Sequence, residues 1–419
     1  MKRKILFIPL VLITAAAGLF AGGQKASQSA SLGTSPNAVS LWYWDDLVTR
    51  DYLTLAREFE QAYSGNKLTL SLIPQDDYWT KLRTALSGGA GPDVFWLNYP
   101  HAASYMSSEN VMELESWAAD INFSNFNERF YKPYTYQGKR YAVPFMWDSV
   151  VLFYNKAAFD TAGIDYPNEN WTWDDFYNAA RGLTIDNGNT ITQYGVLVSG
   201  SMQSGAGPFI YQNEGSIYNS DGTRMTLNTP QAREAVQLQL DMINDGCSPT
   251  AQMTADNSAV NLFTSGLVAM MPFRSYWLSY FAENLKQKLR VAPLPRQQCQ
   301  ATIYNNLAYA AAAKTDNPGA TRKLMSFLAS RRAAEIISNT FAPCYDGVFG
   351  LFFDKYQWAG AHYIPESLNY ALPLPIPSKN AGELWNLVES KMFDIYSEAG
   401  TLDTQLADLE DLVNEDLTR

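Results

Sequence analysis

The spacing of the apolar residues changes from strand-like to helix-like and back again along the first hundred residues. Residues 39–44 form a short β-favouring run, and helical spacing follows over residues 53–63. A second strand at 68–73, a helix from about Asp76 and a third strand at 94–97 come next. Because strands that are separated by single helices pair in parallel, the pattern predicts βαβ units and an α/β fold.

The remainder of the chain continues this pattern with longer helices. Thr172 is a predicted cap for a helix with acidic residues in its first turn. Further strands and helices are predicted at 150–154, 230–244, 307–313, 318–338 and 381–417. No internal repeat of about 20–50 residues is visible, which excludes solenoids and propellers.

The start of the chain has the pattern of an export signal. Residues 2–4 are basic, residues 5–13 are apolar, and small residues follow. This predicts a signal peptide at 1–21 and a flexible leader at 22–37; a retained anchor is the alternative, although the apolar stretch is short for a bilayer. Because the first cysteine is Cys247, we expect no lipid anchor and a periplasmic location.

Composition and charge narrow the possible partners. The 419 residues are 47% hydrophobic and 17% charged, so the chain can bury a large core in two or three domains or two large lobes. The formal charge is −11, and the only cluster of basic residues is at 2–4. We therefore expect no binding to nucleic acid, anionic membrane surfaces or polyphosphates.

The cysteines and histidines do not form a recognisable metal, redox or catalytic motif. Cys247, Cys299 and Cys344 are widely spaced and have no CxxC pattern, and the sequence leaves open whether two of them pair or all are buried free thiols. His101 and His362 are isolated, and we expect them to be surface or core residues. No cofactor and no metal are predicted.

Four segments share their order and spacing with one family. They are the glycine-rich entry to a strand at 88–96, the stretch 141–176 with its Tyr154-Asn155-Lys156 and Trp171-Thr172-Trp173 runs, the segment 263–271 followed by Trp277, and the stretch 291–318. Together they resemble extracellular solute-binding proteins of ABC importers, in the carbohydrate-binding cluster that includes maltose- and oligosaccharide-binding proteins. Leu267 and Val268 depart from this pattern, because a basic residue is common there.

The resemblance implies a periplasmic-binding-protein-like fold, with two α/β lobes, a hinge and a cleft between the lobes. The expected N-terminal lobe is 38–147 with 306–345, and the expected C-terminal lobe is 148–305 with 346–419. It also implies a monomeric carrier that holds a sugar, most simply an oligosaccharide, and delivers it to the permease subunits of an ABC transporter. The four segments supply no nucleophile, base or metal set, so we expect a carrier and not an enzyme.

Residues at the ends of the predicted strands are the first candidates for holding a sugar. Sugars present apolar C–H faces and hydroxyl groups, so their sites need aromatic rings and directed hydrogen bonds. Trp44 and Asp45 follow the first strand, and Asn98 and Tyr99 follow the third. The alternative roles are core packing for the aromatic residues and helix capping for Asp45.

The resemblance adds a pair at the first crossing between the lobes. Counted back from Tyr154-Asn155-Lys156, Asp148 falls where oligosaccharide-binding relatives carry an acidic ligand. Trp147 beside it would supply a stacking surface. The alternative is that the pair serves only as part of the hinge.

Two later groups complete the predicted site, namely Arg274, Tyr276 and Trp277, and then Tyr304, Asn305 and Asn306. The first group matches the segment that brings an aromatic platform into the cleft of relatives, and Tyr276 and Trp277 compete for that position. Arg274 either binds hydroxyls or an acidic sugar, or pairs with an aspartate of its own lobe. The second group lies at the expected second hinge crossing.

Two rival functions remain at this stage. One is the same fold with a non-sugar solute, such as a polyamine or glycerol phosphate, which would need several carboxylates or several basic residues. The other is a secreted glycoside-acting enzyme that uses Asp45 and Asp148 as a carboxylate pair. The predicted cleft is rich in aromatic and amide side chains, which favours a sugar carrier.

Overall fold

The computed structural model describes residues 37–398 and 400–419. The predicted signal peptide and nearly all of the predicted leader lie outside the described residues. In the first part of the chain the elements are β1 (Ala38–Tyr43), α1 (Thr49–Ala62), β2 (Lys67–Leu72), α2 (Gln75–Ser87), β3 (Val94–Asn98), α3 (Tyr99–Met106), α4 (Glu128–Tyr131), β4 (Thr135–Tyr136), β5 (Lys139–Arg140) and β6 (Ala142–Asn155).

The middle and the end of the chain are richer in helices. The middle contains α5 (Lys156–Ala162), α6 (Trp173–Leu183), β7 (Ile185–Asp186), β8 (Ile191–Val196), α7 (Ala206–Gln212), α8 (Pro230–Asn244), α9 (Ala251–Asn257), α10 (Ala259–Thr264), β9 (Val268–Arg274), α11 (Leu278–Leu285) and β10 (Leu289–Ala292). The end contains β11 (Thr302–Ala311), α12 (Pro318–Leu328), α13 (Arg331–Ile337), β12 (Ala342–Pro343), α14 (Gly350–Asp354), α15 (Tyr363–Ser367), β13 (Ala371–Pro373), α16 (Ala381–Ser397) and α17 (Leu402–Thr418).

The first three strands pair as the sequence predicts. β1 is parallel to β2 over its whole length and parallel to β3 at Leu41 and Trp42. Helices α1 and α2 connect these strands, which confirms the predicted βαβ units. The strands end together at one edge of the sheet, so the residues that follow β1 and β3 lie near one another.

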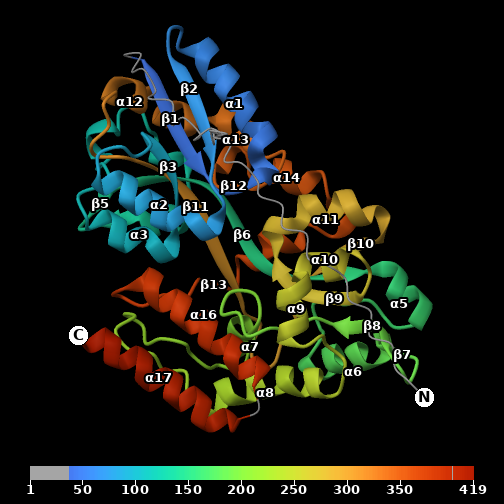
Figure 1. Ribbon diagram of the computed structural model, residues 1–419. Helices are drawn as coiled ribbons and strands as arrows, with labels where there is room; N and C mark the ends of the chain where they lie inside the picture. The colour runs from blue at the N-terminus through green and yellow to red at the C-terminus, as the bar shows by residue number, and fades with distance from the viewer. Residues whose placement is uncertain (1–36, 399) are drawn as a thin grey trace, which may run out of the picture. The chain divides into compact units, whose positions relative to one another are not determined.

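Two long strands link the two halves of the sheet. Within the described residues the main sheet has the order β2-β1-β3-β11-β6-β9-β8-β7, with β10, β12 and β13 pairing onto β6 or β11. The first part of β6 pairs with β11 up to Ser149, and its second part pairs with β9 from Val150 onward (Figure 1). β6 therefore changes its main neighbour next to Asp148, and the strand is much longer than the predicted 150–154.

Two hydrophobic cores lie along this sheet. The first surrounds β1, β3 and β11 and continues past β6 to Phe263 and Phe281. The second is built from α6, α7, α8, α16 and α17 against alternate residues of β6 such as Val150 and Leu152. Successive residues of β6 thus face different cores, as the period of two requires. The lobe boundaries given above stay a prediction.

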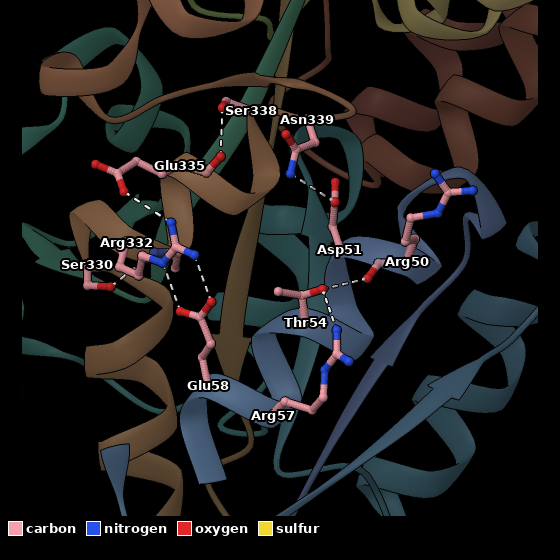
Figure 2. Close-up of polar contacts among 11 residues, drawn as sticks. Arg50, Asp51, Thr54, Arg57, Glu58, Ser330, Arg332, Glu335, Ser338 and Asn339 are labelled. Carbon is pink, nitrogen blue, oxygen red and sulfur yellow. Dashed lines mark hydrogen bonds and ion pairs between the residues drawn. The ribbon is translucent and has the colours of Figure 1, made fainter. Parts of the chain in front are cut away.

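Ion pairs and hydrogen bonds hold α1 against the start of α13 and against the residues that follow that helix (Figure 2). Arg332 donates from Nη2 and Nε to the Glu58 carboxylate at 2.7 and 2.8 Å. The Thr340 hydroxyl donates to Asp51 at 2.7 Å, and Asn339 donates to the same carboxylate at 3.4 Å. These contacts fix the helix that follows Trp44 and Asp45, and hence the position of that loop.

Several helix predictions agree with the structure, and two need correction. Helix α8 has the predicted bounds 230–244, and Thr172 caps α6 through a capping box with Asp175. The predicted helix at 318–338 is two helices, α12 and α13. Ser330 caps the second one, because its side chain accepts a hydrogen bond from the backbone N–H of Ala333. The stretch 381–417 likewise contains two helices, α16 and α17.

All three cysteines are free thiols, which decides the question that their spacing left open. Among the described helices, none combines the length and the apolar character that crossing a bilayer requires.

Candidate functional site

A cavity of about 150 Å³ lies at the strand ends, next to the point where β6 changes its main neighbour. Nine of the twelve residues predicted to hold a ligand line it: Trp44, Asp45, Asn98, Asp148, Arg274, Tyr276, Trp277, Asn305 and Asn306. The structure thus brings together side chains that are spread over more than 260 positions of sequence, from Trp44 to Asn306.

The fold explains why these residues meet. Trp44 and Asp45 follow β1, Asn98 ends β3, and Arg274 ends β9. Asp148 pairs with Asn305 across β6 and β11, so both lie on the floor that links the two halves of the sheet. Ligand sites of open α/β sheets form at such strand ends because side chains from several strands converge there.

Both aspartates of the cavity are buried enough to resist ionisation. Burial raises the pKa of Asp148 to about 6, and the field of Arg274 and a backbone hydrogen bond from Asn305 oppose this. Burial also raises the pKa of Asp45 to about 6, although the Leu47 amide donates to its carboxylate at 2.9 Å. Near neutral pH both are mostly charged acceptors in a poorly solvated site, where a ligand hydroxyl would be held strongly.

Arg274 is the cation that these carboxylates share. It lowers the pKa of Asp45 and Asp148, and also that of Glu389 on α16, which burial raises to about 7. Among the described residues, Arg274 forms no ion pair within 4.0 Å, and its guanidinium carbon lies 5.9 Å from the centre of the Tyr276 ring. Its donors are therefore available to a ligand.

Two further groups in the wall have open hydrogen-bonding capacity. The indole Nε1 of Trp277 and the Oδ1 of Asn305 are buried and have no partner among the described residues. Buried polar atoms are nearly always paired, so an unpaired donor and an unpaired acceptor in the wall of one cavity favour a polar ligand. Asn306, by contrast, already donates a hydrogen bond from its side-chain Nδ2 to the Phe130 carbonyl oxygen at 2.8 Å.

Trp147 needs correction, because the structure places it outside the cavity. It is 0% exposed, and its ring stacks on Phe349 with centroids 5.2 Å apart. Its neighbours Met146 and Asp148 line the cavity, so the alternation of β6 turns Trp147 to the opposite face. We therefore leave Trp147 out of the proposed binding set.

Tyr99 and Tyr304 also lie outside the residues that line the cavity. Tyr304 is 9% exposed and packs edge to face against Phe130. Tyr99 is half-buried. Burial raises the pKa of its hydroxyl, and the nearby Tyr304 adds a smaller increase. Tyr304 belongs to the first core.

Seven other residues line the cavity without having been predicted, namely Gln75, Pro100, Met146, Gln203, Leu307, Leu374 and Trp385. Gln75 follows β2 in the same way that Asp45 follows β1, so strand-end reasoning had the signal to find it. Gln203 comes from a loop and Trp385 from helix α16, and the sequence carries no local sign of their role. The described residues contain no group of three or more metal-ligating side chains.

A mixed sheet whose two halves share β6 and β11, with a polar and aromatic cavity at the strand ends, defines a solute-binding protein of two α/β lobes. The chain belongs to the bacterial extracellular solute-binding protein family, whose family model matches residues 43–335. This membership makes it an extracytoplasmic binding protein.

Individual relatives of the chain are also named as binding proteins. The chain is 30% identical to a binding protein of Brucella abortus over 57% of this chain and 58% of that protein, so the match spans little more than half of the relative. It is 22% identical to the arabinooligosaccharide-binding protein of Bacillus subtilis over 70% of this chain and 68% of that protein.

Among solved structures, the chain is similar to an ABC substrate-binding protein of Listeria monocytogenes in complex with cycloalternan. The TM-score is 0.83 at 26% identity, and the match covers 91% of this chain and 99% of that chain. The expected periplasmic-binding-protein-like fold is thereby confirmed.

Proposed function

We propose that this protein captures a sugar, most simply an oligosaccharide, in the cavity next to Asp148 and delivers it to the permease subunits of an ABC transporter. The observation that carries the proposal is the lining of the cavity, where aromatic rings and charged or amide groups converge. The names of the relatives point the same way, since one binds arabinooligosaccharides and another was solved with cycloalternan.

Each part of the lining has a role in this proposal. The rings of Trp44, Tyr276, Trp277 and Trp385 offer faces for the apolar side of a pyranose. Asp45 and Asp148 accept hydrogen bonds from sugar hydroxyls, while Arg274 and the open Nε1 of Trp277 donate to them.

The charges of the cavity argue against the rival solutes. One arginine surrounded by carboxylates is unfavourable for a phosphate group, because the carboxylates repel it. A polyamine would need its several charges matched, and the charge of Arg274 already acts on Asp45, Asp148 and Glu389. We also propose that the protein is not an enzyme and leaves the sugar unchanged.

The arrangement of the lobes is part of the proposal. We propose an N-terminal lobe of 38–147 with 306–345 and a C-terminal lobe of 148–305 with 346–419. The change of neighbour along β6 next to Asp148 supports a hinge there. Closure of the lobes would remove the bound sugar from water.

The location and assembly state follow from the carrier role. We propose that residues 1–21 are an export signal and that the mature, unlipidated protein is a periplasmic monomer that binds no nucleic acid. A protein of this kind meets its permease by diffusion, so it needs no anchor of its own. N-terminal sequencing of the periplasmic fraction tests the cleavage.

The decisive experiment is a calorimetric panel on the purified protein. We expect at least one mono- or oligosaccharide to bind and to raise the melting temperature, because a ligand at ~100 times its Kd adds ~2.7 kcal/mol of stability. Spermidine and glycerol 3-phosphate serve as controls and should not bind. Hydrolysis of a chromogenic glycoside by the protein would contradict the proposal. Binding of spermidine or glycerol 3-phosphate, with no sugar bound, would contradict it as well.

A further inference from the structure

We propose that His101 is a positioning residue for the cavity: its imidazole holds the side chain of Asn98 so that the Asn98 amide NH2 faces the bound sugar. The inference rests on the proposed function, since it concerns the same cavity. His101 does not line that cavity, and its action runs through Asn98.

The hydrogen bonds around Asn98 carry the argument. Asn98 lines the cavity and also caps α3. Its Oδ1 lies 2.8 Å from Nδ1 of His101 and accepts the backbone N–H of the same residue at 3.3 Å. Both contacts engage Oδ1, and the Nδ2 of Asn98 has no hydrogen-bond partner among residues 37–398 and 400–419. Two N–H donors are thus left for the cavity.

The protonation of His101 fits this role. An amide oxygen only accepts, so Nδ1 must carry the proton that it donates. Burial and, to a smaller extent, the charge of Arg83 lower the pKa of His101 to about 4. The ring is therefore neutral near pH 7, with its single proton on Nδ1 in this network.

The ring itself is held by two other elements. It stacks on Trp79 of α2 with centroids 3.7 Å apart and planes inclined by 8°. Gly382 of α16 lies so close that a Cβ there would stand 2.8 Å from Cδ2 and 2.9 Å from Nε2 of His101. These two contacts leave the ring little freedom, so its Nδ1–H is a fixed donor to Asn98.

A pair of substitutions separates this role from simple packing. His101→Phe keeps an aromatic ring on Trp79 but removes the Nδ1–H donor. His101→Asn removes the ring but places an amide N–H at nearly the position of Nδ1. If His101 positions Asn98, the Phe variant should bind the sugar about fivefold more weakly, as expected for one lost hydrogen bond, and the Asn variant should bind like wild type.

The reverse order of affinities, with His101→Asn weak and His101→Phe unchanged, would show that the ring only packs and would overturn the inference. Two equal affinities that match wild type would do the same. Melting curves without sugar check that both variants fold, and a variant that fails this check leaves the other to decide between the two roles.

A second background tests whether the effect runs through Asn98. Asn98→Ser keeps a cap for α3 but has no amide to point into the cavity. We expect His101→Phe to cause no further loss of affinity in this background, and an additional fivefold loss would overturn the positioning role. If wild type binds no sugar, the proposed function fails; if wild type binds and these comparisons fail, only the present inference does.

Discussion

At the residue scale, Asp148 shows how a ligand-binding group can lower the stability of the folded protein that contains it. The side chain is 5% exposed, and burial raises its pKa to about 6 in spite of Arg274 nearby. The amide of Gln203 approaches its Oδ1 only to 3.5 Å. A carboxylate that is poorly solvated and incompletely bonded gains much from a sugar hydroxyl.

We predict that Asp148→Asn weakens sugar binding. The substitution keeps the shape of the side chain but removes the charged acceptor, so the loss should be about 1.5–3 kcal/mol by isothermal titration calorimetry. Asp165→Asn, the same change at an exposed aspartate outside the cavity, is the control and should leave the affinity unchanged. Equal affinities of wild type and Asp148→Asn would remove Asp148 from the site.

The same substitution should make the sugar-free protein more stable, with a defined dependence on pH. The pKa of Asp148 lies at about 6 in the folded chain, against an ordinary value of 3.8. Between these values the folded state binds more protons than the unfolded state, so wild type loses stability as the pH rises through this window, by ~1.4 kcal/mol per unit of pKa shift.

Denaturant unfolding of both proteins checks this sign. The stability gain of Asp148→Asn over wild type should be small at pH 4, grow up to pH 6 to 7, and then stay constant. A gain that shrinks as the pH rises would contradict the cause assigned to the pKa, because it would mean that the charged form is favoured by folding.

At the scale of elements, helix α16 packs into the second core and also contributes to the wall of the proposed sugar cavity. Leu384 and Val388 pack into the second core, whereas Trp385 lines the cavity. The first turn of α16 contacts the first half of the chain, where Gly382 lies against His101 and Glu383 pairs with Arg83 at 3.3 Å. The seating of this turn therefore sets the position of Trp385.

We predict that Gly382→Ala weakens sugar binding by about 1–2 kcal/mol, because the added methyl group overlaps the His101 ring and displaces α16. Gly319→Ala in α12 is a matched control, since nothing lies within 4 Å of a Cβ there. Calorimetric titrations of both variants measure the effect. A Gly382→Ala protein that binds like the control would show that α16 tolerates the shift.

At the scale of the whole molecule, the two halves of the sheet are connected through β6 and β11 and through the stretch that follows β12. We expect hinges near Trp147–Val150, Tyr304–Asn306 and Cys344–Phe349, because the chain passes between the proposed lobes at these three places. The cavity takes residues from both sides of the first two of these segments, for example Asn98 and Trp277. A bound sugar that contacts both sides would hold them together.

We predict that saturating sugar lowers the radius of gyration in small-angle scattering, because the proposed lobes close around the solute. Asp148→Asn at ~10 times the wild-type Kd, where a loss of about 1.5–3 kcal/mol leaves the variant less than half occupied, is the control and should scatter more like the free protein. Superimposable curves with and without sugar, measured on a sample whose binding is established, would mean that the cavity fills without closure.

Much of the fold could be predicted because its signals are local. The parallel strands β1 to β3 and helix α8 follow from periodicity and from turn and capping residues. The break between α12 and α13 was not predicted. Serine is compatible with the surface of a continuous helix, and only the tertiary context makes Ser330 a cap. The length of β6 was missed because the strand is buried nearly throughout and lacks a simple alternation.

The sequence by itself determined the α/β class, the polar strand ends at Asp45 and Asn98, and the family resemblance, which pointed to Asp148. These follow from residue order and from the rule that parallel strands end at one edge. Only the tertiary structure decided that Trp147 is buried, that Trp385 joins the cavity, and that His101 meets Gly382. Such contacts join residues far apart in the chain, and periodicity records which face of an element is buried but not what packs against it.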